Sequence, residues 1–312
     1  MFRRIVKQTS CLVRQPNLQH RNYGLSGFRL DSTISKPPDL QGKTPMDIEK
    51  ELFRLKRDMT SLYSKGLYHD ALEVSLFLEN QVKQEMGTNN AIYASCLNNI
   101  ALMHKMLGNN TDAMDAYTEA LHIYQDVKGK KHVSYAATLA NLGALYKTMA
   151  TGTKGMEKLQ LLERAEEALF DAKVLRTELL GPTSRETIYS CIHLSSVWNI
   201  RGKEKEARQL LLESLDVATR EFGRVDVITA TILNNLGLMH KSNKMFAAAN
   251  ECYSEALNVR TEILGESHPD TIVTMHNIAE LLLAQGQVGA AAKLQEKVRK
   301  EGRKEGRILI FF

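Results

Sequence analysis

Apolar residues recur at helical spacing along most of the chain. They fall at positions i, i+3, i+4 and i+7, the pattern of a helix that buries one face. One such set of packing positions holds Leu97, Ile100, Ala101 and the bulky His104, and the set that follows Gly108 is Ala113, Tyr117 and Ala120. From residue 46 to the end the only prolines are Pro182 and Pro269, so little interrupts these helices. The pattern predicts an all-α chain.

The helical pattern itself repeats at a fixed interval of 42 residues. The alanines that open the second helix of each unit are Ala71, Ala113, Ala165, Ala207, Ala249 and Ala291. The glycines in the connections to the next unit keep the same spacing, and they are Gly87, Gly129, Gly181, Gly223 and Gly265. In both series one interval is 52, which places ten extra residues in the third unit. We interpret these, around residues 150–159, as a lengthened turn between paired helices.

Small residues, among them Gly143 and Gly237, stand where the two helices of a unit are expected to cross. This order of large and small residues resembles the tetratricopeptide repeat. The connection Leu264-Gly265-Glu266-Ser267-His268-Pro269-Asp270-Thr271 resembles the kinesin-light-chain subtype. The resemblance implies an all-α, right-handed superhelical solenoid of about six helix-turn-helix repeats over residues 46–307. Ser184 and Asp270 are expected to cap helices that start after prolines.

The first thirty residues contain five Arg and one Lys but no acidic residue. On a helical projection the apolar residues fall on one face and the basic ones on another. This segment resembles a mitochondrial presequence, and we expect cleavage near Tyr23. Residues 1–23 are the predicted presequence, residues 24–45 a flexible linker and residues 308–312 an apolar tail. A disordered basic tail is the alternative for the first segment.

Charge and composition narrow the function. The net charge is +5, and five basic residues more than acidic ones lie in the first 23 positions, which leaves the repeats neutral. Four isolated cysteines predict neither a disulfide framework nor a zinc site. No nucleotide-binding loop or G-x-S-x-G elbow occurs. We therefore expect no enzymatic activity, no cofactor, no metal and no small-molecule substrate.

One polar position recurs just before the packing Leu or Ile of the first helices, and its residues are Asn99, Asn141, His193, Asn235 and Asn277. The family resemblance implies that this position lines a concave groove, where amides bind the backbone of an extended partner segment. Alternatively, each Asn bonds within its own superhelix. Related repeat proteins clamp a terminal carboxylate with a Lys and an Arg on the first helix of one pair. Here Tyr189 and His193 stand in that place, which argues against such a clamp.

Basic residues mark two further places. Lys105, Lys147 and Lys241 recur near the rim of the predicted groove, where they either meet acidic partner residues or are solvated. The C-terminal helix has a net charge of +4, from Lys293, Lys297, Arg299, Lys300, Arg303, Lys304 and Arg307 against Glu296, Glu301 and Glu305. It is either a solvated cap or a peripheral contact with an anionic membrane or RNA.

These features predict a non-enzymatic scaffold in mitochondria, in the matrix or at the matrix face of the inner membrane. It would hold a segment of a partner protein in the groove, as an assembly or stability factor does. One alternative is a cytoplasmic cargo adaptor like kinesin light chain, although no heptad coiled coil precedes the repeats here. The other is an RNA-binding helical repeat protein, against which the 42-residue period and the neutral face argue.

Overall fold

The computed structural model describes residues 45–304, and it contains twelve α-helices and no strand within that range. The all-α prediction is confirmed. The predicted presequence, the linker up to residue 44 and the tail 308–312 lie outside the described residues. No described helix is long and apolar enough to cross a membrane.

The helices form six antiparallel pairs, as the 42-residue period predicts. The first helices of the pairs are α2 (Pro45–Ser64), α4 (Ala91–Met106), α6 (Val133–Thr151), α8 (Arg185–Ile200), α10 (Val227–Ser242) and α12 (Pro269–Ala284). The second helices are α3 (Tyr68–Met86), α5 (Asn110–Lys128), α7 (Gly155–Leu180), α9 (Glu204–Phe222), α11 (Phe246–Leu264) and α13 (Val288–Lys304).

Each first helix from α4 onward begins at a side-chain cap, which accepts a hydrogen bond from an otherwise unpaired backbone N–H. Ser184 caps α8 as predicted, because its Oγ accepts from the N–H of Thr187 at 3.2 Å. The prediction for Asp270 is wrong. The cap of α12 is His268, whose Nδ1 accepts from the N–H of Asp270 at 3.2 Å, and Pro269 occupies the first helical position.

Each second helix from α3 to α11 ends at one of the recurring glycines. At Gly223, for example, φ is 89° and ψ is 172°. Side chains larger than hydrogen are almost excluded from this backbone region. The glycine period in the sequence therefore marks the points where the chain leaves one pair and enters the next.

The ten extra residues of the third unit are helical, which corrects the prediction of a lengthened turn. Helix α6 has 19 residues, whereas α4, α8, α10 and α12 have 16. Helix α7 has 26 residues, whereas α5, α9 and α11 have 19. Only residues 152–154 separate α6 from α7. The insertion lengthens both helices because its sequence contains no proline.

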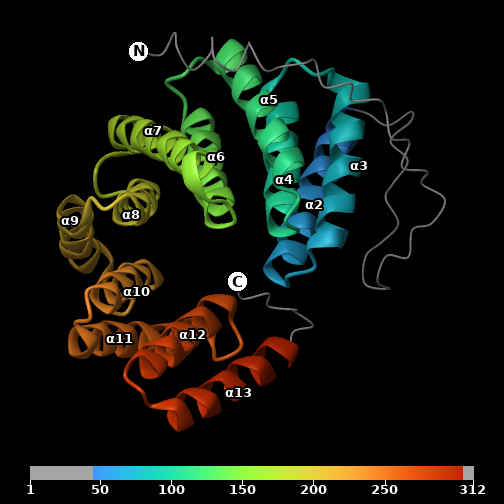
Figure 1. Ribbon diagram of the computed structural model, residues 1–312. Coiled ribbons are helices and arrows are strands. Elements are labelled where there is room, and N and C mark those ends of the chain that lie inside the picture. The colour runs from blue at the N-terminus through green and yellow to red at the C-terminus, as the bar shows by residue number, and fades with distance from the viewer. Residues whose placement is uncertain (1–44, 305–312) are drawn as a thin grey trace. The chain divides into compact units, whose positions relative to one another are not determined.

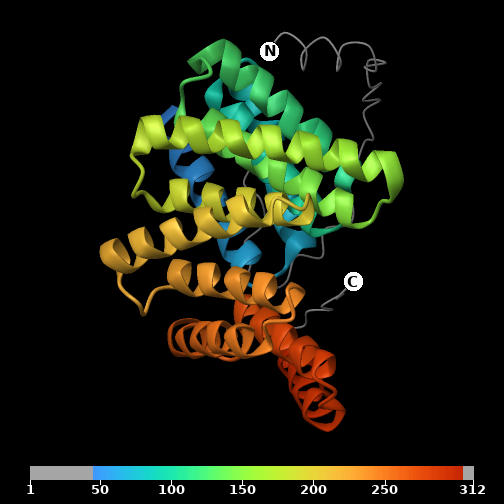
Figure 2. The same ribbon diagram turned by 60° about the vertical axis from the view of Figure 1, so that its left-hand side comes forward.

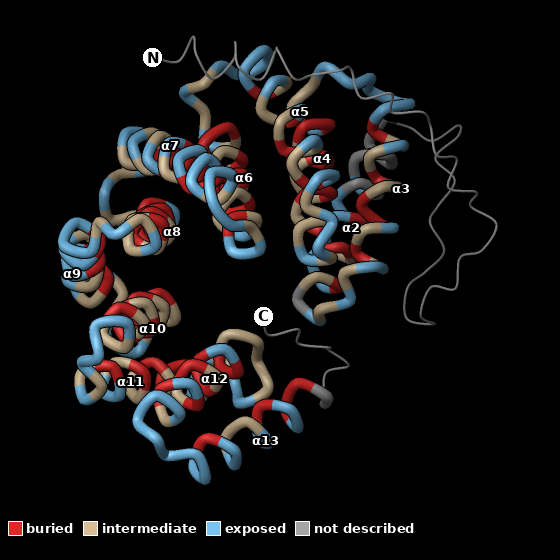
Figure 3. Tube along the Cα trace, viewed as in Figure 1, coloured by how far each residue is buried: buried red, intermediate tan, exposed pale blue. Residues whose placement is uncertain are grey.

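Within residues 45–304 the pairs follow one another along a curved path (Figures 1 and 2). Helices α4, α6, α8, α10 and α12 each contact the next member of this series, and they form the inner layer of the curve. We call the side chains that they present along this layer the inner face. Buried residues lie mainly where helices pack on one another (Figure 3).

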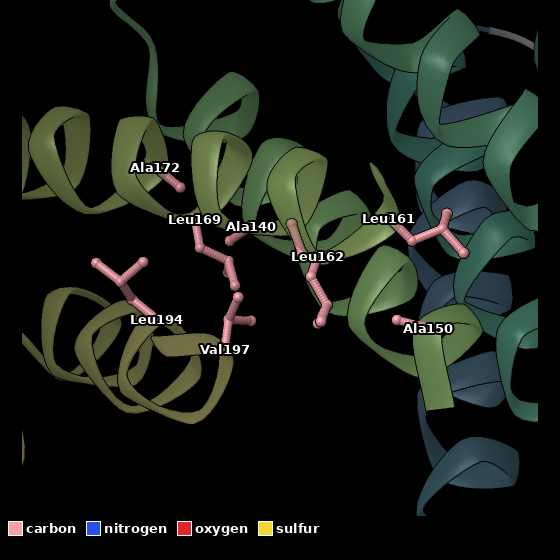
Figure 4. Packing of buried hydrophobic residues seen from close by; sticks show 9 residues of the cluster. Ala140, Ala150, Leu161, Leu162, Leu169, Ala172, Leu194 and Val197 are labelled. Carbon is pink, nitrogen blue, oxygen red and sulfur yellow. The ribbon is translucent and has the colours of Figure 1, made fainter. Parts of the chain in front are cut away.

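The core is divided into clusters, each shared by adjacent pairs, as expected for a solenoid. One cluster joins α6, α7 and α8, where Leu162 and Leu169 pack against Leu194 and Val197 (Figure 4). Ala165 is completely buried in the same cluster. The small side chain permits the close approach of the helices that the repeat pattern predicts.

Candidate functional site

The recurring polar position lies on the inner face, one residue per inner helix. Asn99, Asn141, His193 and Asn235 are half-buried, and Asn277 is buried. These residues lie in a row because they occupy equivalent positions of successive repeats, and the inner helices stack side by side.

Two of these amides are bonded to the neighbouring inner helix. Asn141 Nδ2 donates to Asn98 Oδ1 at 3.2 Å, and Asn277 Nδ2 donates to Asn234 Oδ1 at 2.9 Å. Both bonds join consecutive inner helices, α4 to α6 and α10 to α12. For this pair the arrangement matches the structural alternative raised from the sequence. The signal for it was present in the doublets Asn98-Asn99 and Asn234-Asn235.

The other two asparagines lack such a partner. Asn235 Nδ2 donates to the carbonyl oxygen of Thr231 in its own helix at 2.8 Å, and its Oδ1 accepts no hydrogen bond from the described residues. Asn99 makes no side-chain hydrogen bond within the described part of the chain. In the two bonded pairs the acceptor is the residue just before the recurring position of the preceding inner helix. For Asn235 the residue at that place is Ile192 of α8, and an isoleucine has no amide to accept the bond. Polar atoms of Asn99 and Asn235 are therefore open to a ligand.

The three recurring lysines form a second column on the inner face. Lys241 Nζ donates to Glu280 Oε2 in α12 at 2.6 Å. Lys147 Nζ donates to the hydroxyl oxygen of Ser196 in α8 at 3.3 Å. Lys105 makes no ion pair with a described residue. All three lysines are half-buried rather than extended into solvent.

Burial and mutual repulsion depress the basicity of this region. The pKa of Lys147 is lowered to about 8, mainly by desolvation and further by the charge of Lys105. Desolvation also lowers the pKa of Lys105. The pKa of His193 is lowered to about 3 by desolvation and then by Lys147, Lys105 and Arg176, so this imidazole is neutral near pH 7. The structure thus brings together three predicted site residues from α4, α6 and α8.

Two buried arginines behind the inner layer were not predicted from the sequence. Arg176 Nη1 donates to Ser190 Oγ at 2.8 Å, and Arg260 Nη1 donates to Thr274 Oγ1 at 2.7 Å. Each guanidinium thereby fixes a second helix to the first helix of the next pair. The two arginines stand two repeat lengths apart in the sequence, and this recurrence is the signal from which they could have been predicted.

The basic C-terminal helix has some of its charges paired. Lys297 Nζ lies 2.9 Å from Glu266 Oε1, and Lys300 Nζ lies 2.9 Å from Glu296 Oε1. Both pairs are largely exposed, so they contribute little to stability. Contact of this helix with an anionic membrane stays a prediction. Among the described residues no group of three or more His, Cys, Asp or Glu is placed to hold a metal ion.

Comparison with known proteins identifies the same repeat. The model of the tetratricopeptide repeat family matches residues 94–150, 184–260 and 228–300. A clustered mitochondria protein homolog of Aspergillus niger is 24% identical over 179 residues, which are 57% of this chain and 14% of that protein. The chain therefore spans about a seventh of the length of this curated relative.

Solved structures show the same fold at low sequence identity. A putative kinesin light chain from Podosopora anserina has a TM-score of 0.50 and 18% identity, over 70% of this chain and 98% of that one. The Rap conjugation gene regulator of plasmid pLS20, in complex with the Phr* peptide, has a TM-score of 0.57 and 14% identity, over 84% and 76%. At these identities the similarity concerns the fold alone.

Proposed function

From the premise that this chain belongs to the tetratricopeptide repeat family, we propose that it is a non-enzymatic scaffold that holds a segment of a partner protein. The observation that carries the proposal is the inner face, where polar side chains recur at one residue per helix, half-buried in four helices and buried at Asn277. An extended segment presents its backbone donors and acceptors at regular intervals, which suits such a row. The repeat fold typically serves as an interaction scaffold, and the peptide complex of the Rap regulator supports the proposal by fold analogy.

The groups that contact the segment are drawn from the predicted set. Asn99 and Asn235 have polar atoms open to a ligand, whereas Asn141 and Asn277 also bond a neighbouring inner helix. His193 adds a neutral ring with one donor and one acceptor. Each amide bond to a partner backbone is worth about 0.5–1.5 kcal/mol.

The first experiment compares two double variants in affinity capture from isolated mitochondria. Asn99→Ala with Asn235→Ala should keep the helicity and melting temperature of the wild type and weaken capture roughly five- to hundredfold. The matched control, Asn141→Ala with Asn277→Ala, removes two bonds between inner helices and should lower the melting temperature. Wild-type capture by a folded Asn99 and Asn235 variant would contradict the proposed contact.

We place the scaffold in mitochondria, in the matrix or at the matrix face of the inner membrane, as an assembly or stability factor. The support is the basic, acid-free first thirty residues together with the similarity to a clustered mitochondria protein homolog. A reporter fused to residues 1–30 should enter mitochondria and lose about 23 residues. Charge reversal by Arg3→Glu and Arg4→Glu should abolish import. A reporter that stays cytosolic and uncut would favour the cytoplasmic adaptor instead.

A further inference from the structure

The lysine column has a counter-ion at one end of the inner face and lacks one at the other. In register, each lysine of one inner helix faces one position of the next inner helix. Hydrogen bonds place Glu280 opposite Lys241 and Ser196 opposite Lys147. The same register in the sequence assigns Ala144 to Lys105. The fold therefore repeats the same geometry with three different side chains opposite the ammonium group.

The contacts follow the chemistry of the facing side chain. Lys241 is neutralised by the Glu280 carboxylate at 2.6 Å. Lys147 reaches only the Ser196 hydroxyl, at 3.3 Å, and a hydroxyl accepts a hydrogen bond but does not balance a charge. The methyl group of Ala144 offers Lys105 no acceptor at all.

The two unbalanced lysines also lie in a basic setting. The charge of Lys105 acts on Lys147, and both act on His193 together with Arg176 of α7. Arg176 has the carboxylate of Glu186 nearby, but neither lysine forms an ion pair with a described residue. Like charges held in a partly desolvated region repel one another, and an anion placed between them removes this repulsion.

We propose that Lys105 and Lys147 bind carboxylates of acidic side chains in the polypeptide segment that occupies the inner face. This inference rests on the proposed function, because it gives the chemical class of the segment held there. The lysines are partly exposed, and their partial burial reduces the solvent screening of the ammonium charges. An acidic residue of the ligand takes, at these two sites, the place that Glu280 takes beside Lys241.

The test measures binding of short probe peptides to the full chain by calorimetry. The probe is hexaglutamate capped at both ends, and the neutral comparison is capped hexaglutamine. Hexaglutamate should bind at least tenfold more tightly. Lys105→Gln and Lys147→Gln should each weaken hexaglutamate binding about tenfold. Lys241→Gln combined with Glu280→Gln is the matched control, and it should change binding less than twofold because it removes a pair whose charges already cancel.

A second variant supplies the missing counter-ion from within. Ser196→Glu recreates at Lys147 the pair seen between Lys241 and Glu280, so it should weaken hexaglutamate binding about tenfold while circular dichroism stays unchanged. Wild-type affinity of both lysine variants, or equal binding of hexaglutamine, would overturn the inference. Binding of inorganic phosphate that displaces hexaglutamate at equal concentration would also overturn it, since the site would then take a free anion.

The two proposals fail separately. If the lysine variants bind normally while the Asn99 and Asn235 variant loses its captured partner, the inner face holds a segment that is not recognised by its acidic residues. If capture does not depend on Asn99 and Asn235 but hexaglutamate binding depends on the lysines, the acidic site stands and the proposed amide contacts are wrong.

Discussion

Gly237 and Tyr253 approach so closely that a β-carbon on Gly237 would stand 2.7 Å from both Cδ1 and Cε1 of the tyrosine ring. Tyr253 is completely buried in a core cluster with Ala249 and Leu281, so a shift of its ring would disturb that packing. The same relationship holds in α6 and α7, where a β-carbon on Gly143 would stand 2.7 Å from Cγ of Leu169. These contacts fix the separation of the paired helices.

We expect Gly237→Ala to lower the free energy of unfolding by about 1 kcal/mol. Alanine favours the helix by roughly 1 kcal/mol, but overpacking of a close crossing costs about 1–3 kcal/mol. The matched control is Gly289→Ala in α13, where an added β-carbon meets nothing within 4 Å. Urea unfolding should show a loss for the first variant and none for the second. Equal stabilisation of both would mean that α10 and α11 are farther apart.

A second prediction concerns the turn between α10 and α11. Lys244 has φ of 58°, whereas the corresponding turns of other pairs have glycine with positive φ at Gly66, Gly108, Gly202 and Gly286. A left-handed conformation costs an ordinary L-residue about 1–2 kcal/mol. Glycine avoids this cost, but it loses more backbone entropy on folding, which offsets part of the gain. Lys244→Gly should therefore raise the free energy of unfolding by about 0.5–1 kcal/mol, measured by thermal unfolding. A lower melting temperature for this variant would show that the lysine side chain stabilises the turn.

The helix pairs could be predicted from sequence because the signals are local and repeat six times. A glycine such as Gly223 ends a helix through its own backbone conformation, and a small residue such as Gly237 marks a crossing through its own size. The insertion could not be placed in the same way. Residues 150–159 have no counterpart in the other units, so their glycines suggested a turn, while the absence of proline let α6 and α7 grow.

The sequence predicted which residues recur at the candidate site, but it did not predict the contacts among them. Asn141 bonds to Asn98 and Lys241 to Glu280, which requires the register between neighbouring helices as well as the period within the chain. The pKa of His193 is lowered by desolvation and further by lysines from two other helices. Such effects depend on which side chains the superhelix brings together, and a single repeat does not contain that information.

A third prediction uses Trp198, the single tryptophan of the chain. Its Nε1 donates to Glu166 Oε1 at 2.9 Å, and Lys203 Nζ donates to the same oxygen at 2.6 Å. Arg201 bonds the other carboxylate oxygen of Glu166. Glu166→Ala leaves Trp198 and Lys203 without their acceptor and Arg201 with Glu163 alone. The free energy of unfolding should therefore fall by about 1–3 kcal/mol, and the fluorescence of Trp198 should change.

The control for this network is a second glutamate in the same helix. Glu163 is largely exposed and contacts only Arg201, at 3.4 Å. Glu163→Ala should therefore change the free energy of unfolding by less than about 0.5 kcal/mol and leave the fluorescence spectrum as it is. Similar effects of the two substitutions would assign the stability to Arg201 rather than to the carboxylate of Glu166.

The last prediction is a pH dependence that originates at His193. Desolvation lowers its pKa most, and the charges of Lys147 of α6, Lys105 of α4 and Arg176 of α7 lower it further, to about 3. In the unfolded chain its pKa is about 6.5. Between these two values the unfolded state binds a proton that the folded state does not, so the free energy of unfolding falls as the pH falls from about 6.5 toward 3.

His193→Asn, which installs the residue found at this position in other repeats, removes this dependence. Urea unfolding of the two proteins at pH 7, 6 and 5 should give the wild type an additional loss of about 1 kcal/mol at pH 5. Parallel stability curves would mean that the imidazole is protonated in the folded protein as readily as in the unfolded chain, and that the cations of the inner face lie too far away to act on it.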